Sequence, residues 1–344
     1  MKHWLVCVAA VVVALIVGGI DVTNSPGTPS IPRVAYVTGT GSSASTVWIA
    51  RADGSHARRL GRGSQPLLAP DGSLVAASST PGLVLYSASG VALRRYFETS
   101  DAIATAAAFS ADSRYLAVVL STRDPVSASF SSLAVINTAT LAHRIVARGQ
   151  IYGASFAPDG SDRLAYASAG SLALSARIDI HVAGADGSGA AQITHDGRSL
   201  NPVWGARGIA FDHERLRTNA EPAYQIWVMA SDGSARRPLT ALGIPALREG
   251  LVPTAFSADG AVLLAEYVGQ DTSQAWILRL SGGRPAALGD NLVGAALSRT
   301  GRTALVDRSG FLSAPNRGVV EAWPLAGGRP RILSAHGSEP SWNV

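Results

Sequence analysis

One 15-residue pattern recurs along this chain without gaps. It reads VWIARADGSHARRLG at 47–61, IHVAGADGSGAAQIT at 180–194 and IWVMASDGSARRPLT at 226–240. In each copy apolar residues alternate before an Asp-Gly or similar pair, and a period of two places one face of a strand on a core. Asp-Gly favours a tight hairpin, because glycine adopts positive φ without a Cβ clash and aspartate bonds its own backbone. The pattern predicts a repeated β-hairpin, with Gly-Gly copies at 275–289 and 320–334.

A second motif precedes each hairpin and consists of an apolar strand, a turn of the Pro/Ser-Asp-Gly type and another apolar strand. Its copies lie at 65–78, 106–119, 153–168, 201–211, 253–267 and 294–307. Together the two motifs give repeating units of four strands, here called A to D from first to last. Units of this size and strand number are typical of β-propeller blades.

The two ends of the chain complete one blade. Residues 33–61 supply B, C and D strands without an A strand, and SEPSWNV at 338–344 matches only the start of an A strand. Pairing the two ends closes the ring and removes an open sheet edge. We therefore predict an all-β single propeller with seven blades. Six is the alternative if the weak unit at 294–307 is not independent.

Composition agrees with one compact β domain at 33–344. Hydrophobic residues make up 47% of the 344 residues and charged residues 15%, which argues against disorder. The net charge is +5, and every basic residue except Lys2 is an arginine. We interpret this bias as a consequence of GC-rich coding, since no local arginine cluster typical of nucleic-acid binders is visible. No nucleic-acid partner and no oligomer are expected.

The N-terminus predicts export. Lys2 precedes an uncharged apolar run at 4–20, and a linker at 21–32 follows it. A run of this length suits a cleaved signal peptide or a retained N-terminal membrane anchor, so both remain open for residues 1–20. We expect the propeller to lie outside the cytoplasm, secreted or anchored to the cytoplasmic membrane. The only cysteine, Cys7, lies within the apolar run, so the exported domain lacks disulfides and thiol catalysis.

The repeat resembles that of a known family. FAPDG at 156–160, FSADG at 256–260 and the hairpin at 226–240 are similar to the TolB-type (WD40-like, PD40) propeller repeat of exported bacterial proteins. The resemblance covers residues 33–344 and implies the fold rather than an activity, since the shared residues form strands and turns. TolB itself carries an α/β domain before a six-bladed propeller. Only 12 residues separate Ile20 from Arg33 here, so the resemblance implies no TolB role in envelope assembly.

Strand order predicts two unlike faces. The short A–B and C–D turns belong to one end of the strands, here called the turn face. The B–C and D–A connections belong to the other end, here called the loop face. The longest of them are predicted at 121–132, 212–223, 268–274, 307–318, 194–200 and 241–250. Variable loops on a rigid scaffold commonly carry binding.

The loop face supplies the candidate binding residues, which are polar or charged and follow no repeat. They are Arg123, His195, Asp196, His213, Glu214, Arg215, Arg217 and Arg317. Two histidines near carboxylates suit a metal or acid–base chemistry, but no tight ligand spacing appears. We therefore assign no metal, no cofactor and no catalytic residue.

Two repeated residue types are interpreted as structural. The aspartates of the tight turns are expected to cap their own backbone, and Trp48, Trp227 and Trp276 to pack between blades. We predict a non-catalytic scaffold that binds a protein or cell-envelope partner. The alternative is a metal-dependent glycan-active enzyme, since some propeller polysaccharide lyases resemble this repeat. No Gly-x-Ser-x-Gly elbow supports a peptidase.

Overall fold

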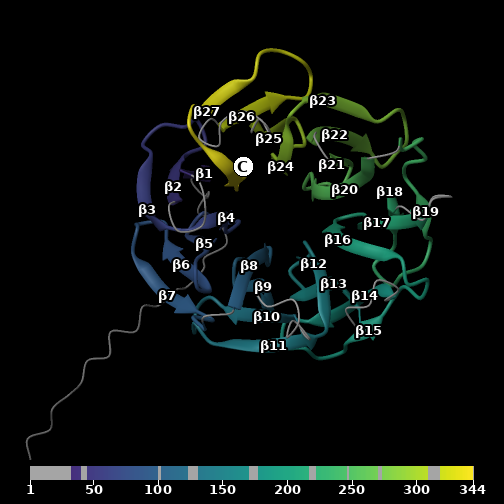
Figure 1. Ribbon diagram of the computed structural model, residues 1–344, viewed down its shortest axis with the longest axis horizontal. Helices are drawn as coiled ribbons and strands as arrows, with labels where there is room; N and C mark the ends of the chain where they lie inside the picture. The colour runs from purple at the N-terminus through teal and green to yellow at the C-terminus, as the bar shows by residue number, and fades with distance from the viewer. Residues whose placement is uncertain are drawn as a thin grey trace, which may run out of the picture.

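The chain folds into a closed ring of blades (Figure 1). The computed structural model describes residues 32–39, 45–99, 102–122, 131–169, 177–216, 222–245, 248–269, 273–308 and 318–343. Within these ranges all 28 elements are strands, which form seven four-stranded blades. No helix of this part of the chain is long and apolar enough to cross a membrane. The predicted export segment at 1–20, and all of its linker except Pro32, lie outside the described residues.

Each blade runs from the axis outward in the order A, B, C, D. Blades 1 to 4 consist of β28 (Ser338–Trp342), β1 (Arg33–Thr38), β2 (Thr46–Arg51) and β3 (Arg58–Arg62); β4 (Ser64–Leu68), β5 (Leu74–Ser78), β6 (Leu83–Ser87) and β7 (Ala92–Tyr96); β8 (Ala102–Phe109), β9 (Tyr115–Thr122), β10 (Ser132–Asn137) and β11 (His143–Arg148); and β12 (Gln150–Phe156), β13 (Arg163–Ala169), β14 (Ile178–Gly184) and β15 (Ala191–Gln192).

Blades 5 to 7 continue the same order. They consist of β16 (Ser199–Gly205), β17 (Gly208–Leu216), β18 (Pro222–Met229) and β19 (Arg237–Pro238); β20 (Arg248–Phe256), β21 (Val262–Gly269), β22 (Ser273–Arg279) and β23 (Ala286–Asp290); and β24 (Val293–Leu297), β25 (Thr303–Arg308), β26 (Val319–Pro324) and β27 (Arg331–Ser334). The weak repeat at 294–307 thus forms the A and B strands of a blade of its own. A single parallel bridge from Tyr224 to Gly250 links blades 5 and 6 into one sheet.

The predicted closure is confirmed. β28 pairs antiparallel with β1, with Val34 opposite Trp342 and Ala35 opposite Ser341. The backbone N–H of Arg33 also donates to the Asn343 side chain at 2.7 Å. The strand from the C-terminus therefore becomes the innermost strand of blade 1 (Figure 1).

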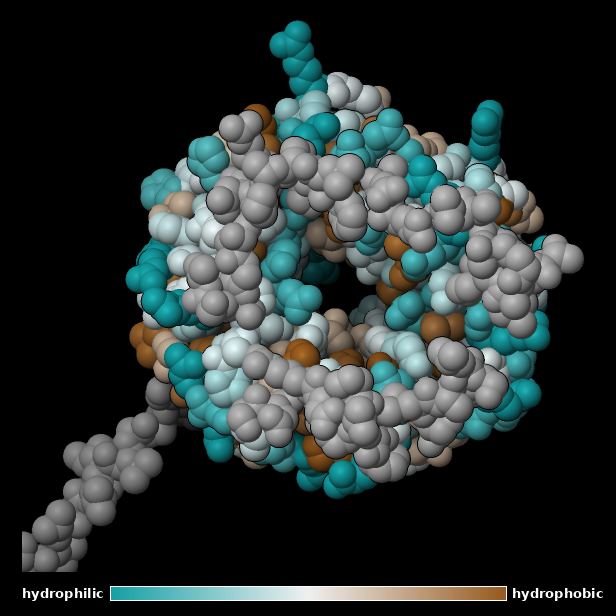
Figure 2. Space-filling model, viewed as in Figure 1, coloured by the Kyte–Doolittle hydropathy of each residue, from teal (hydrophilic) through white to brown (hydrophobic). Residues whose placement is uncertain are grey.

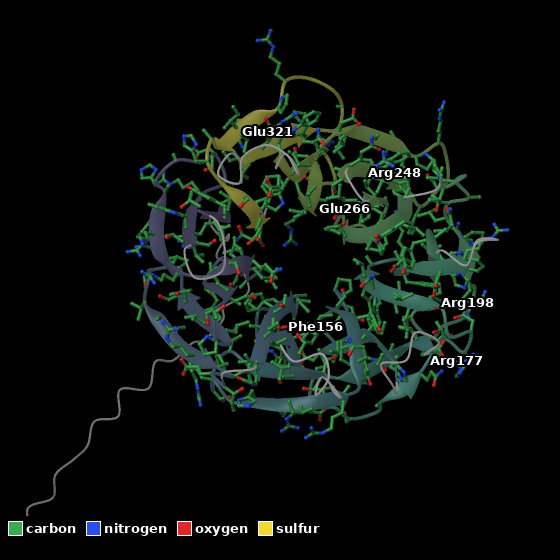
Figure 3. All side chains as sticks on the ribbon, viewed as in Figure 1. Phe156, Arg177, Arg198, Arg248, Glu266 and Glu321 are labelled. Atoms are coloured by element: carbon green, nitrogen blue, oxygen red, sulfur yellow. The ribbon has the colours of Figure 1, made fainter. Side chains whose placement is uncertain are left out.

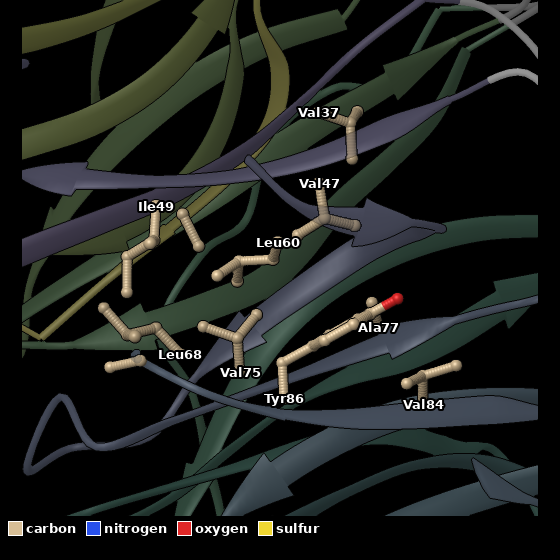
Figure 4. Packing of buried hydrophobic residues seen from close by; sticks show 11 residues of the cluster. Val37, Val47, Ile49, Leu60, Leu68, Val75, Ala77, Val84 and Tyr86 are labelled. Carbon is tan, nitrogen blue, oxygen red and sulfur yellow. The ribbon is translucent and has the colours of Figure 1, made fainter. Parts of the chain in front are cut away.

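The hydrophobic core is divided among the junctions between blades. At the junction of blades 1 and 2, Val47 and Ile49 of β2 pack against Val75 of β5 and Tyr86 of β6 (Figure 4). The tryptophans expected between blades do lie there, because Trp48, Trp227 and Trp276 each contact a cluster shared by two blades. The ring formed by these junctions surrounds a central opening (Figure 2).

The repeated turn aspartates cap their own backbone, as predicted. In each turn the Asp Oδ1 accepts the N–H of the second residue after it, at 2.9–3.0 Å, in Asp53, Asp71, Asp159, Asp186, Asp232 and Asp259. These bonds fold the turn without contributions from distant parts of the chain, which explains why the motif was visible in the sequence.

Gly233 allows a direct test of this turn chemistry. Its φ is 86°, and a Cβ there would lie 2.3 Å from the carbonyl oxygen of Ile193 in blade 4. Gly233→Val should therefore cost about 2–4 kcal/mol of unfolding free energy, because it combines an unfavourable backbone region with a steric clash. The measurement is the denaturation midpoint. Ser234→Val, at an exposed position of the same turn, should change it little, and equal midpoints for the two variants would contradict the assignment.

Five outer arginines share a contact that the sequence analysis did not foresee. Each donates from its D strand to a backbone carbonyl in the C–D turn of the next blade. The pairs are Arg58 with Ala88, Arg94 with Leu141, Arg144 with Asp186, Arg237 with Leu280 and Arg331 with Ala52. GC-rich coding does not account for one repeated contact, so at these positions arginine also links neighbouring blades.

The predicted bounds of the loops at 121–132 and 212–223 were wrong. β9 continues to Thr122, and β17 pairs with β18 as far as Leu216 opposite Pro222. Asp212, His213, Glu214 and Arg215 therefore lie on a strand rather than in a loop. The physical reason is that ladder hydrogen bonds join backbone groups, so a strand can extend beyond its apolar stretch.

Candidate functional site

A cleft of about 370 Å³ opens on blade 5, on the side that faces blade 4. Strands β17 and β18, the end of β19, the D–A connection after it and the residue just before β16 form its walls. We call it the blade-5 cleft; it is lined by Arg198, His213, Glu214, Arg215, Gln225, Trp227, Pro238, Thr240, Ala241 and Leu242. Arg198 lies toward the outer side of the ring (Figure 3). The cleft therefore brings together three of the predicted binding residues.

Buried hydrogen bonds fix the wall made by the D–A connection. The Gln225 side-chain oxygen accepts from the Thr240 hydroxyl at 2.8 Å and from the Leu242 N–H at 3.0 Å. Its amide nitrogen donates to the Leu242 carbonyl at 2.8 Å. Asp179 holds the corresponding connection of blade 4 through Thr194 and Gly197. Because every polar atom of the Gln225 amide group is engaged, this wall is preformed.

Asp196 is the centre of a polar cluster beside the cleft. Its carboxylate accepts from Arg236, from the Arg198 N–H at 3.1 Å and from the Ser199 hydroxyl at 3.0 Å. Burial alone would raise the pKa of Asp196, but these hydrogen bonds and the Arg236 charge outweigh it and lower the pKa to about 2. The group is therefore a permanent carboxylate near neutral pH.

His213 connects this carboxylate to the aromatic floor of the cleft. Its Nε2 lies 3.2 Å from Asp196 Oδ2, and its ring stacks on Trp227 with centroids 4.6 Å apart. A carboxylate only accepts hydrogen bonds, so Nε2 carries the proton. Burial lowers the pKa of His213 more than Asp196 raises it, which keeps the ring neutral near pH 7.

The cleft combines aromatic rings with arginine side chains, one beside the rings and two at the rim. Asp196 stays ionised near neutral pH, and the Arg236 guanidinium lies over the rings of Phe211 and Trp227 at 5.8 and 6.0 Å. Arg198 and Arg215 at the rim are exposed and have no ion pair within the described residues. The described part of the chain brings together no group of three His, Cys, Asp or Glu side chains that could hold a metal ion.

The predicted residues divide into three groups. Asp196 and His213 contact each other, and Glu214 and Arg215 line the same cleft. His195 is exposed, its carbonyl accepts from Arg177, and no contact joins its ring to His213 within the described residues. The structure therefore does not join the two histidines. The remaining predictions lie outside the described residues; they are Arg123, Arg217 and Arg317.

Four residues of the site were missed in the sequence. Arg198 lay within the predicted connection at 194–200 but carried no motif, and Gln225 lay between the predicted loop at 212–223 and the hairpin at 226–240. Arg236 replaces the alanine found at that position in the other Asp-Gly copies, Ala57 and Ala190. Trp227 was assigned to packing, and it does pack between blades, but its ring also lines the cleft. The replacement of alanine by Arg236 was the one feature of the sequence that could have identified a residue of this site.

Comparisons with known proteins agree with the ring. No protein-family model and no curated protein sequence matches the chain. TolB from Acinetobacter baumannii is 15% identical with a TM-score of 0.58, over 92% of this chain and 67% of that one. The propeller domain of the Trilobed protease from Pyrococcus furiosus is 11% identical with a TM-score of 0.62, over 88% of this chain and 92% of that one.

An oligogalacturonate lyase in complex with manganese is also similar. It is 10% identical with a TM-score of 0.58, over 82% of this chain and 83% of that one. At these identities the likeness concerns the fold alone, and the similar structures include enzymes as well as TolB. The chain therefore has the fold of a TolB-like β-propeller.

Proposed function

We propose that this protein is a non-catalytic scaffold that binds a protein partner of the cell envelope in the blade-5 cleft. The observation that carries the proposal is the combination of an aromatic and apolar floor, made by Trp227 and Leu242, with two rim arginines that form no ion pair with any described residue. Aromatic rings and arginine are the side chains most enriched at interface hot spots.

The chemistry of the cleft defines the partner segment. An apolar side chain would cover Trp227 and Leu242, and an adjacent carboxylate would pair with Arg198 or Arg215. The wall held by Gln225 is already fixed, so binding costs little ordering of the cleft itself. The predicted N-terminal export segment supports a location outside the cytoplasm, secreted or membrane-tethered.

Filling the cleft should abolish this binding. Ala241 is exposed and lines the cleft, so Ala241→Trp should occupy the space of the partner side chain without disturbing the core. The full chain is used to capture partners from native envelope, and the captured protein is then titrated against both forms. We expect at least a tenfold weaker affinity for Ala241→Trp, with an unchanged melting temperature.

A matched variant on the opposite end of the same blade is the control. Ser234 is exposed in the C–D turn of blade 5, and Ser234→Glu should leave partner affinity unchanged. If Ser234→Glu weakens binding while Ala241→Trp does not, the partner uses the turn face and the proposal is wrong. The alternative of a metal-dependent glycan-active enzyme gains no support from the cleft, because His195 and His213 do not share a site.

A further inference from the structure

A second hollow, on the turn face of blade 1, is lined by basic side chains. It has a volume of about 310 Å³, with Arg33, Arg51, His56 and Arg58 around it and Ile49 beneath. Arg33 and Arg51 are opposite each other in the β1–β2 ladder, and Arg58 begins β3. We call these residues the basic hollow. Three strands of one blade thus place three guanidinium groups around a single depression.

These three arginines have no acidic partner within the described residues. The nearest turn carboxylate, Asp53, accepts from the Ser55 N–H at 2.9 Å and from its hydroxyl at 2.6 Å. Asp71, in the A–B turn of blade 2, is engaged in the same way by Ser73. The local carboxylates therefore cap their turns and leave the guanidinium groups of Arg33 and Arg51, and the remaining N–H donors of Arg58, available to an anion.

The excess of positive charge lies in the part of the chain that forms most of blades 1 to 3. Residues 33–148, which form most of blades 1 to 3, contain 11 arginines and six acidic residues. Residues 149–343 contain 17 arginines and 17 acidic residues. The net charge of +5 thus belongs to one side of the ring, and an extended anionic surface would be attracted to that side.

Exposed apolar side chains flank the hollow on both sides. Val91, in the C–D turn of blade 2, is 57% exposed, and Ile332 on β27 of blade 7 is 58% exposed. The turn that carries Val91 and the strand that carries Ile332 are both tied to blade 1, since Arg58 donates to the Ala88 carbonyl and Arg331 to the Ala52 carbonyl. Basic groups with apolar side chains next to them are the composition of a surface that lies on a membrane.

In the sequence, a short linker joins the predicted apolar run to the strand that begins at this face. The run ends at Ile20, 12 residues separate it from Arg33, and a fully extended linker of that length reaches about 40 Å at most. Because Arg33 begins β1 at the turn face, a chain held at residues 4–20 would present this face, rather than the loop face, to the bilayer.

We propose that the basic hollow docks on an anionic phospholipid membrane. Arg33, Arg51 and Arg58 hold the phosphodiester groups of the lipid, and Val91 and Ile332 enter the headgroup region beside them. Guanidinium groups suit this role because their planar donors match phosphate oxygens. The blade-5 cleft is then free for a separate partner. Docking needs no such partner, so this proposal can fail or hold independently of the proposed function.

Vesicle partitioning of the full chain tests the proposal. Two kinds of vesicle are compared, one with 30% phosphatidylglycerol and one of pure phosphatidylcholine. The apolar run contributes to binding of both kinds, so the measured quantity is the ratio of the two partition coefficients. We expect a ratio of at least about 10 at 50 mM salt, which falls severalfold at 300 mM salt because electrostatic binding is screened. Arg33→Gln with Arg51→Gln should lower the ratio at least fivefold at 50 mM salt while the Arg58 contact to blade 2 stays in place.

A second double variant removes the same charge elsewhere. Arg59→Gln with Arg62→Gln changes exposed arginines of β3 that do not line the hollow, and it should lower the ratio less than twofold. Melting temperatures establish that both variants are folded. An equal loss in the two variants would show a response to net charge alone and would overturn the proposal. So would a wild-type ratio near 1.

Discussion

Deletion of residues 338–344 should cost more stability than any single substitution outside the core. The deletion removes β28, whose Trp342 is 8% exposed and packs against Val34 and Leu305 in the cluster that joins blades 1 and 7. Loss of a buried Trp side chain costs about 3–5 kcal/mol, and each lost ladder hydrogen bond about 0.5–1.5 kcal/mol. The sum rivals the whole stability of a typical domain, so we expect a melting temperature lowered by tens of degrees or no cooperative transition.

A peptide of residues 337–344 provides the matched test. Added to the truncated protein, it should restore the transition, because the exposed edge of β1 would accept it as a strand. The Leu68 N–H, which donates to Ser341 at 3.0 Å, gives a local marker of that rescue by hydrogen exchange. Equal melting temperatures of the truncated and intact proteins would contradict the closing role of β28.

Asp212→Asn should stabilise the protein at pH 8 and have little effect at pH 4. Asp212 is 1% exposed on β17, and its Oδ2 accepts from the Asn201 amide at 3.1 Å while its Oδ1 has no partner. Burial raises the pKa of Asp212 from 3.8 to about 7, and the nearby Glu214 charge adds to this. The native protein thus carries a carboxyl group that resists ionisation.

The pH window follows from the direction of that shift. Below pH 3.8 the carboxyl is protonated in both the folded and the unfolded chain and contributes nothing. Between 3.8 and about 7 only the unfolded chain ionises, so stability falls as pH rises; above about 7 the loss is complete. A shift of this size corresponds to a loss on the order of 4 kcal/mol. Asparagine cannot ionise, so Asp212→Asn should not lose stability as the pH rises.

Denaturant unfolding of both proteins between pH 4 and 8 measures this effect. Asp307→Asn should behave similarly over a narrower window, since burial raises the pKa of Asp307 only to about 6. Asp232→Asn, at an exposed turn position where hydrogen bonds from Ser234 lower the pKa of the aspartate, should show no gain at pH 8. If the stability difference for Asp212→Asn does not change with pH, the burial of a neutral carboxyl is wrong.

The blades could be predicted because their determinants are local. Alternation along β18 and the hydrogen bond from the Ser234 N–H to Asp232 involve residues within one hairpin. The closing pair was also predictable, although its strands are separated by the whole chain, because SEPSWNV matches the A strand of the repeat and the first blade lacks one. Because the blades repeat, this long-range strand pair could be predicted by comparing each end of the chain with the repeat.

The candidate site could be predicted only in part. The polar segments at 194–200 and 212–223 were identified correctly as neighbours, because consecutive connections of one face lie close together. The contacts that their side chains make were not predicted. Asp196 meets His213 across 17 residues and Arg236 across 40, and no spacing rule connects those positions.

By itself, then, the sequence determined the strand pattern, the turn chemistry, the number of blades and the closure of the ring. Each of these depends on backbone conformation and on apolar side chains that repeat with the blade. The tertiary structure alone decided the pairing of Asp196 with His213 and Arg236, the shift in the pKa of Asp212 and the arginine contacts between blades. Those properties arise where residues far apart in the sequence come together, and both burial and electrostatic interaction depend on distance in space rather than on separation along the chain.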